Sequence, residues 1–229
     1  MCQSSSYRTN IIHIFRTDQG RNDLLNDITL KLDIKARYRV IPDILLSFVF
    51  LALMIISANS FFYLPFTPVP ITTQTFTLML SVVILKKKWA FLTQLEYVFL
   101  GACGLPVFAG GRGGLAVLLG PTGGYILGFI IAAYLTGYLL ERRMTLKVFK
   151  RFDRSLYLTI VCIAGLGMIY ISGYIGLLVN ALLLDRGTGI ASLSRMVFDL
   201  GVRPFIIADM IKIVILVVMT KRLSKGKND

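Results

Sequence analysis

The sequence predicts an all-α integral membrane protein built as a six-helix bundle, and three observations lead to this fold class. First, 55% of the 229 residues are apolar and only 16% are charged, an apolar share above that of ordinary soluble domains. Second, the mean hydropathy is +0.72, and the apolar residues form long blocks, as expected of helices that cross a bilayer. Third, lysines and arginines bracket these blocks, so the net charge of +13 fits the positive-inside pattern better than a nucleic-acid-binding face. We therefore expect contact with a lipid bilayer and no nucleic-acid partner.

The first 39 residues are polar and mixed in charge, so we expect a cytoplasmic N-terminal extension (residues 1–39). A membrane domain (residues 40–222) and a basic C-terminal tail (residues 223–229) follow it. The apolar spacing within residues 23–38 fits an amphipathic surface helix and a partly disordered tail about equally well. The first apolar block begins only near Ile41, after acidic residues, so no cleavable signal peptide is expected.

Residues 41–104 contain the first three predicted spans. Residues 41–62 are long enough, at about 1.5 Å per residue, to cross a hydrocarbon core of roughly 30 Å. Three prolines within residues 63–71 predict a stiff extended loop that returns toward the membrane. A short second span (residues 72–85) ends at a run of three lysines, and the third reaches about Gly104. Within the third span, Glu96 suits a helix-packing contact and a gating group equally.

Residues 123–222 contain the remaining three spans. The fourth is predicted at residues 123–140 and the fifth at residues 156–184, a run long enough to tilt strongly. Residues 185–203 form a polar loop with a short amphipathic piece, and the sixth span opens at Pro204.

The positions of the basic clusters set the predicted orientation. Six spans place all four clusters on one side of the membrane, which makes both termini cytoplasmic. The glycine-rich segment between helices 3 and 4 then becomes an extracellular loop, and we expect a multi-pass protein of the plasma or inner membrane. The clusters are residues 31–39, 86–88, 142–154 and 221–227.

Small residues recur every four positions along the start and body of the fourth span: Gly120, Gly124, Gly128, Ala132 and Thr136. Such a ridge lets another helix approach closely. Internal packing is the favoured interpretation, and sliding against a partner protein is the alternative.

Asp209 and Lys212 are the main candidate functional residues. They lie three positions apart within the sixth span, and this spacing places them on one helix face. Burying either charge in a membrane costs at least about 2.5–3.5 kcal/mol on insertion scales. An ion pair that is merely tolerated is possible, but a buried pair is a poor source of stability. Intramembrane charges more often mark a substrate or ion path.

The sequence offers no catalytic, cofactor or metal motif. The glycine segment lacks the preceding strand of a dinucleotide-binding unit, and Gly120-Pro121-Thr122 does not end as a P-loop does. Three scattered cysteines and a single histidine do not form a zinc site. We therefore expect no catalytic residue, no metal and no ATP hydrolysis in this chain.

A ligand pocket is the remaining interpretation. Glycine amides would supply donors, and Phe108, Tyr125 and Tyr170 would supply flat apolar walls. Asp209 and Lys212 would supply an acceptor and a donor at depth. Gln74 can donate and accept hydrogen bonds in such a pocket, although it could equally cap its own helix. This set suits a small polar ring with a neutral head and an apolar body, with or without a carboxylate.

Residues 41–216 resemble a known family on three motifs. Residues 68–76 read PVPITTQTF, residues 104–111 and 120–125 read GLPVFAGG and GPTGGY, and residues 203–205 read RPF ahead of Asp209 and Lys212. In these motifs the chain resembles the BioY-type biotin-binding S subunits of energy-coupling-factor (ECF) vitamin transporters. Two family features are changed: Ile207 and Ala208 replace the usual Pro-Gly, and the first helix lacks the Ala-xxx-Ala docking motif.

The resemblance implies a subunit that captures biotin at the outer face for import. Asp209 and Lys212 would contact the ureido head, and the loop around Gly110, Gly111 and Gly113 would close over the ligand. A coupling membrane subunit and ATPase subunits would use the ATP. Two alternatives stay open: an S-type subunit for another small vitamin or a lipoate-like acid, and an intramembrane lipid-modifying enzyme.

Overall fold

The computed structural model describes residues 41–145, 153–184 and 189–225. The chain divides into two compact units, Met1–Leu45 and Leu46–Asp229, and the architecture below is that of the second unit. The predicted N-terminal extension lies outside the described residues, as does the end of the basic tail.

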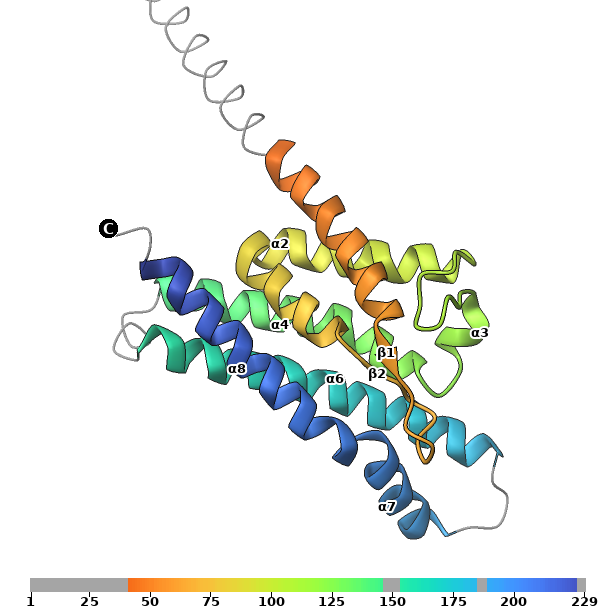
Figure 1. Ribbon diagram of the computed structural model, residues 1–229. Helices are drawn as coiled ribbons and strands as arrows, with labels where there is room; N and C mark the ends of the chain where they lie inside the picture. The colour runs from red at the N-terminus through yellow and green to blue at the C-terminus, as the bar shows by residue number, and fades with distance from the viewer. Residues whose placement is uncertain (1–40, 146–152, 185–188, 226–229) are drawn as a thin grey trace, which may run out of the picture. The chain divides into compact units, whose positions relative to one another are not determined.

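Helices make up nearly all of the regular structure (Figure 1), which confirms the all-α class. With α2 counted as two segments, the described residues provide a helix for each of the six predicted spans. The elements in chain order are a first helix, Ile41–Asn59, then β1 Phe61–Phe62, β2 Ile71–Thr72, α2 Gln74–Ala102, α3 Leu115–Leu118, α4 Gly123–Thr145, α6 Arg154–Leu184, α7 Ile190–Gly201 and α8 Arg203–Lys225. By length and composition, three of the described helices could cross a membrane: Ile41–Asn59, Gly123–Arg142 and Arg154–Leu184.

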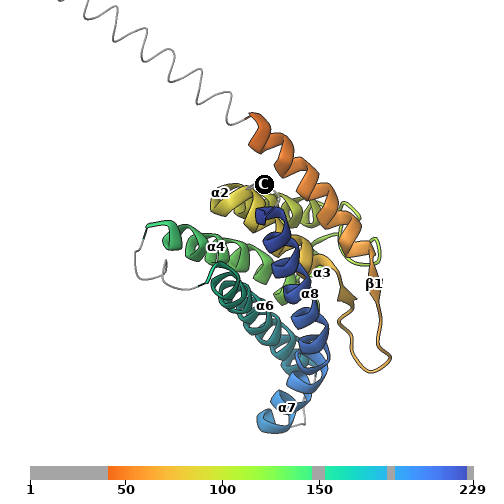
Figure 2. The same cartoon turned by 60° about the vertical axis from the view of Figure 1, so that its left-hand side comes forward.

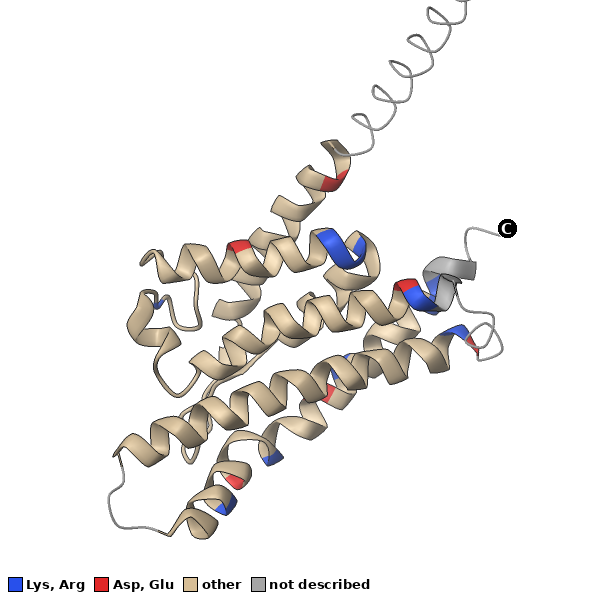
Figure 3. Ribbon diagram, turned by 180° about the vertical axis from the view of Figure 1, so that it is seen from behind, with Lys and Arg blue, Asp and Glu red and all other residues tan. Residues whose placement is uncertain are grey.

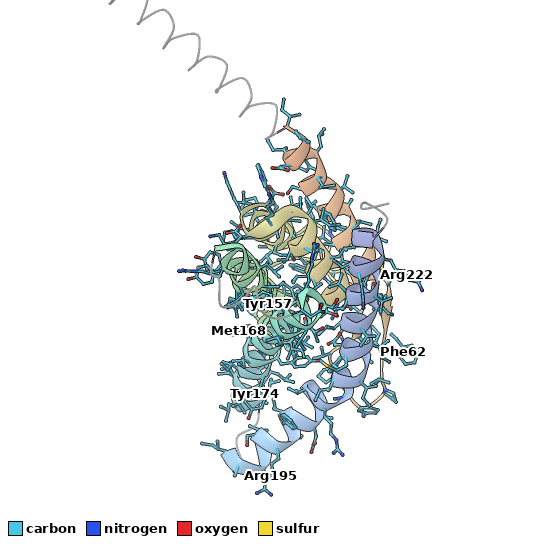
Figure 4. All side chains as sticks on the ribbon, turned by 90° about the vertical axis from the view of Figure 1, so that its left-hand side faces the viewer. Phe62, Tyr157, Met168, Tyr174, Arg195 and Arg222 are labelled. Atoms are coloured by element: carbon cyan, nitrogen blue, oxygen red, sulfur yellow. The ribbon has the colours of Figure 1, made fainter. Side chains whose placement is uncertain are left out.

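The first helix ends earlier than the sequence predicted. It stops at Asn59, and Phe61 and Phe62 instead pair in antiparallel register with Thr72 and Ile71. Because the proline-rich loop returns the chain alongside β1, the strand pair satisfies backbone groups that a helix would otherwise have bonded internally. Phe62 is 65% exposed and lies at the edge of the bundle (Figure 4).

The second and third predicted spans are joined by a sharp bend without a loop. Both belong to α2, and the helix breaks at Lys86, whose φ is 65° and ψ is −178°. Residues other than glycine rarely adopt this backbone region. Gly137 of α4 faces the bend, because a Cβ there would lie 2.5 Å from the Cα of Lys87. Close contact with α4 therefore accompanies the break.

The small-residue ridge of α4 packs against α6, as the favoured interpretation predicted. A side chain at Gly124 would collide with the backbone at Ser172, and a Cβ at Gly128 would lie 3.1 Å from the Cα of Ile169. Ser172 donates its hydroxyl to the Gly124 carbonyl at 2.7 Å. The two helices run side by side in both views (Figures 1 and 2), so α4 and α6 form a close-packed pair beside the site.

Candidate ligand-binding site

A cavity opens between α2, α4, α6, α8 and the glycine-rich segment. The space open to the centre of a water molecule is about 70 Å³, several times the roughly 10–15 Å³ that a single water needs. Its lining is mainly apolar, with a few polar groups from α2 and α8. The lining residues are Val69, Pro70, Thr72, Gln74, Thr75, Tyr97, Phe108, Ala109, Arg112, Val117, Thr122, Tyr125, Ile126, Phe129, Ile169, Tyr170, Phe205, Asp209 and Lys212.

Asp209 and Lys212 meet at this cavity. The Lys212 Nζ lies 2.6 Å from the Asp209 Oδ1, and the exposed fractions of the two side chains are 17% and 6%. Asp209 Oδ1 also accepts from the Thr75 hydroxyl at 2.7 Å, and its Oδ2 accepts from the Tyr170 hydroxyl at 2.7 Å. The carboxylate thus joins α2, α6 and α8, and the short, charge-assisted bonds hold it in one orientation.

The ammonium of Lys212 has no spare donor. Besides the carboxylate, it donates to the Thr72 carbonyl at 2.6 Å and to the Thr75 hydroxyl at 3.1 Å, and an ammonium has three N–H groups. The buried charges are therefore compensated by the protein itself. A ligand oxygen can bind Lys212 only by displacing one of these partners, and the long contact to Thr75 is the weakest.

Gln74 and Tyr97 form a second polar group at the cavity. The Gln74 Nε2 donates to the Tyr97 hydroxyl at 2.8 Å, and that hydroxyl donates to the Val107 carbonyl at 3.2 Å. Gln74 does not cap its own helix; the Thr72 hydroxyl accepts from the Gln74 backbone amide instead. Its side-chain oxygen has no hydrogen bond within the described part of the chain, so it is available to a donor in the cavity.

Phe108 lines the cavity with an apolar ring. Its exposed fraction is 1%, and its ring meets Tyr97 edge-on with 5.5 Å between centroids. A Cβ at Gly101 would collide with the Phe108 ring. Glycine at the end of α2 therefore lets the ring turn inward from the loop.

Tyr125 and Tyr170 both line the cavity, but their hydroxyls have different partners. The Tyr125 hydroxyl donates to the Gly201 carbonyl at 2.6 Å, which ties α4 to the end of α7. The Tyr170 hydroxyl bonds Asp209. Tyr125 therefore offers a ligand its ring alone, whereas Tyr170 also positions the carboxylate.

The three predicted loop glycines do not line the cavity. Gly110 and Gly111 have φ values of 75° and 66°, a conformation that glycine adopts without strain. The Gly111 amide donates to the Asn59 side chain at 3.1 Å, and a Cβ at Gly113 would collide with the Leu105 carbonyl. These glycines shape the loop, and their neighbours Ala109 and Arg112 contact the space.

Arg112, Thr72, Thr75 and Tyr97 line the site but were not among the residues predicted from sequence. Arg112 pairs with Phe108 in an isolated bridge and donates to the Tyr63 hydroxyl at 2.9 Å. An arginine directly after two loop glycines was a usable signal, because it is a cation beside predicted pocket walls. Thr72 and Thr75 gave no such signal in the sequence, because their contacts depend on where α8 crosses α2.

Within the part of the chain that the structure describes, no group of three or more histidine, cysteine or acidic residues could hold a metal ion. The arrangement can instead bind a small molecule through a carboxylate acceptor, an amide oxygen, aromatic walls and a guanidinium at the loop.

Comparison with known proteins identifies relatives over most of the chain. Residues 29–229 match the model of the BioY family. The "Biotin transporter BioY" of Thermotoga maritima is 38% identical over 77% of this chain and 92% of its own. The "Probable biotin transporter BioY" of Pyrococcus horikoshii is 40% identical over 68% of this chain and 81% of its own.

One solved structure has a similar fold. It is the crystal structure of the S-component for biotin from an ECF-type ABC transporter, with a TM-score of 0.67 and 25% sequence identity. The match covers 82% of this chain and 93% of that one.

Proposed function

The chain belongs to the BioY family, and we propose that it is the membrane substrate-binding subunit through which a cell takes up biotin. Its relatives are named biotin transporters, and a protein of similar fold is the S-component for biotin of an ECF-type transporter. As a member of a transporter family, the chain is not an enzyme. Biotin is the transported ligand, and no cofactor is required.

The observation that carries this proposal is the Asp209–Lys212 pair inside the cavity. The pair has no net charge, it is nearly inaccessible, and its hydrogen bonds reach three helices. A neutral group that carries both donors and an acceptor is the natural partner for such a pair, and the ureido ring of biotin has two N–H groups and one carbonyl. Burial of a second full charge beside the pair would be far more costly.

We propose that the ureido ring binds to the polar atoms that can still form a hydrogen bond. One ureido N–H donates to Asp209 Oδ2, which accepts only from Tyr170 among the described residues. The other donates to the side-chain oxygen of Gln74. The ureido carbonyl accepts from Lys212 in place of Thr75, whose contact is 3.1 Å long.

The rest of biotin is proposed to lie toward the loop. Its sulfur ring and alkyl chain pack on Phe108, Tyr125 and other apolar lining residues. The carboxylate lies by the Arg112 guanidinium, which suits carboxylate geometry. We propose that the loop around Gly110, Gly111 and Gly113 closes behind the ligand, since their backbone geometry admits little substitution.

The membrane arrangement is proposed from the charge pattern. The chain is a membrane protein with six spans of the plasma or inner membrane, its termini in the cytoplasm and the glycine loop outside. A membrane domain of residues 40–222 follows the extension of residues 1–39. An ECF coupling subunit and ATPase subunits complete the transporter, because this sequence contains no nucleotide-binding motif.

A ligand panel tests the proposed function. Isothermal titration calorimetry of the full-length protein in detergent would compare biotin, lipoic acid, thiamine and riboflavin. Lipoic acid is the informative control, because it shares the pentanoate chain and a sulfur ring but has no ureido group. We expect saturable binding of biotin alone, with biotin recovered unchanged. Equal affinity for lipoic acid, or chemical conversion of biotin, would refute the proposal.

A further inference from the structure

A second cavity lies in the same helical unit, away from the ligand site. It measures about 570 Å³, within the range of roughly 300–1,000 Å³ usual for small-molecule sites. Its walls come from the first half of α2, the end of α4, the start of α6 and the end of α8. The lining residues are Val82, Val83, Lys86, Gly137, Leu140, Glu141, Arg154, Tyr157, Leu158 and Thr220.

This cavity lies at the other end of the bundle from the loop-covered site. Along α8, Thr220 is eleven residues beyond Asp209, which corresponds to about 16 Å of helix. Arg222, near Thr220, and Arg195 lie at opposite ends of the α7–α8 segment (Figure 4). The second cavity is thus separate from the proposed biotin site.

The charges at this end are mostly positive. Lys86 and Arg154 line the cavity, and the acidic lining residue Glu141 is paired with Lys87 at 3.5 Å. Further basic residues lie at the same end of α2, α4 and α8 (Figure 3). The lining therefore combines two basic side chains, and one acidic side chain that is paired with Lys87, with apolar walls.

The backbone at Lys86 brings this side chain to the cavity at a cost. A φ of 65° with a ψ of −178° belongs to a region used almost only by glycine. A lysine stands at this position, although glycine would adopt the conformation without strain. Such outliers cluster at active sites, ligand clamps and switch regions.

Aromatic residues mark this end as a membrane–water interface. The Lys87 ammonium lies 5.7 Å from the ring centroids of both Tyr134 and Tyr138, and the Arg142 guanidinium lies 4.9 Å from the Tyr138 ring. Tyrosine and tryptophan gather at the depth of lipid headgroups, and Trp89 follows the lysine run. In the membrane arrangement proposed above, on which this step rests, the cavity lies at the depth of the lipid headgroups.

We propose that this cavity binds the phosphate of an anionic phospholipid. Lys86 and Arg154 contact the phosphate oxygens, and Val82, Val83 and Leu158 contact the upper part of the acyl chains. Basic pockets between membrane helices bind anionic headgroups in this manner. A free phosphate ion would share the charge contacts but would leave the apolar walls uncovered.

The test is lipid titration of the purified full-length protein, followed by native mass spectrometry. The probes are dioctanoyl phosphatidylglycerol, dioctanoyl phosphatidylcholine and inorganic phosphate. We expect phosphatidylglycerol to bind at least about tenfold more tightly than phosphatidylcholine. Lys86→Gln/Arg154→Gln should lose about twenty- to thirtyfold of that affinity, since each basic group near an anionic lipid contributes about fivefold.

The matched control is Lys88→Gln/Arg222→Gln, which removes the same charge from the same end but from residues that do not line the cavity. We expect it to lose less than about threefold. Lys86→Gly/Arg154→Gln provides a second cavity variant in which the bend is unstrained, and unchanged thermal unfolding verifies the fold of each variant. Equal affinity for the two lipids, equal losses in both charge variants, or phosphate binding as tightly as the lipid would overturn the proposal.

Discussion

The Asp209–Lys212 pair allows a double-mutant cycle that separates a binding role from a structural one. Asp209→Asn leaves the Lys212 ammonium without its counter-charge, and Lys212→Met leaves the carboxylate with only neutral donors from Thr75 and Tyr170. Breaking one side of a buried pair costs about 3–5 kcal/mol. Because each remaining charge keeps two neutral partners, we expect the lower end, about 3 kcal/mol of stability for each single change.

The double variant Asp209→Asn/Lys212→Met should recover much of that stability, because no unpaired charge remains. In a domain of this size, a loss of about 3 kcal/mol corresponds to a fall in Tm of about 6–12 °C. We expect a smaller fall in the double variant than in either single variant. The two residues are in direct contact, so non-additivity of this kind is expected.

Biotin affinity should follow a different pattern. Each single change removes a ligand contact and leaves a buried group unpaired, so the binding free energy should weaken by about 2–4 kcal/mol, which raises the Kd roughly 30- to 1,000-fold. The double variant regains stability but no ligand contacts, and its affinity should stay as low. Calorimetry and thermal unfolding on the same preparations measure both quantities. If the double variant bound biotin within about twofold of the wild type, the pair would be purely structural.

Three further substitutions test the walls of the site. Gly101→Ala should push Phe108 out of the cavity, with a stability loss of about 1–3 kcal/mol and weaker biotin binding in calorimetry. Gly167→Ala is the control, because the new Cβ meets open space. Equal effects of the two substitutions would refute the steric argument. Tyr125→Phe should lower stability by about 1 kcal/mol, seen as a lower Tm, yet change affinity less than about twofold, because its hydroxyl bonds a backbone carbonyl. Arg112→Met should weaken biotin up to about fivefold but leave biotin amide unaffected, and an equal loss for both ligands in calorimetry would exclude a carboxylate contact.

Local patterns in the sequence were sufficient to predict the helices and the charged pair. Spacing of three residues placed Asp209 and Lys212 on one face because helix geometry alone decides it. The four-residue recurrence through Gly124 and Gly128 likewise predicted a close helix contact, and α6 supplies the partner. In both cases the prediction depends only on the spacing of residues within one helix.

The features that sequence did not predict depend on chain segments far apart. Thr75 contacts Asp209 across 134 positions, and Arg112 contacts Tyr63 across 49, so no local period encodes either pair. The break at Lys86 was expected as the end of a span followed by a new one, because three lysines normally leave the membrane. Contact with Gly137 allows the chain to turn there in a single residue.

The compensation of Lys212 by the protein itself also determines which ligands the site can favour. An empty pocket with unpaired charges would attract any counter-ion, but here all three ammonium donors and both carboxylate oxygens already have partners. At Lys212 a ligand gains only by offering a bond at least as good as the one it displaces, and the rest of its binding free energy comes from the acceptors with spare capacity and from apolar contact along Phe108 and Tyr125. A site that matches polar groups in this way rejects an analogue lacking them much more strongly than it rejects a small change in apolar shape. We therefore expect selectivity for a ureido ring over the dithiolane of lipoic acid to arise at the Asp209 end, and we expect the Arg112 end, which is exposed, to contribute orientation and little discrimination.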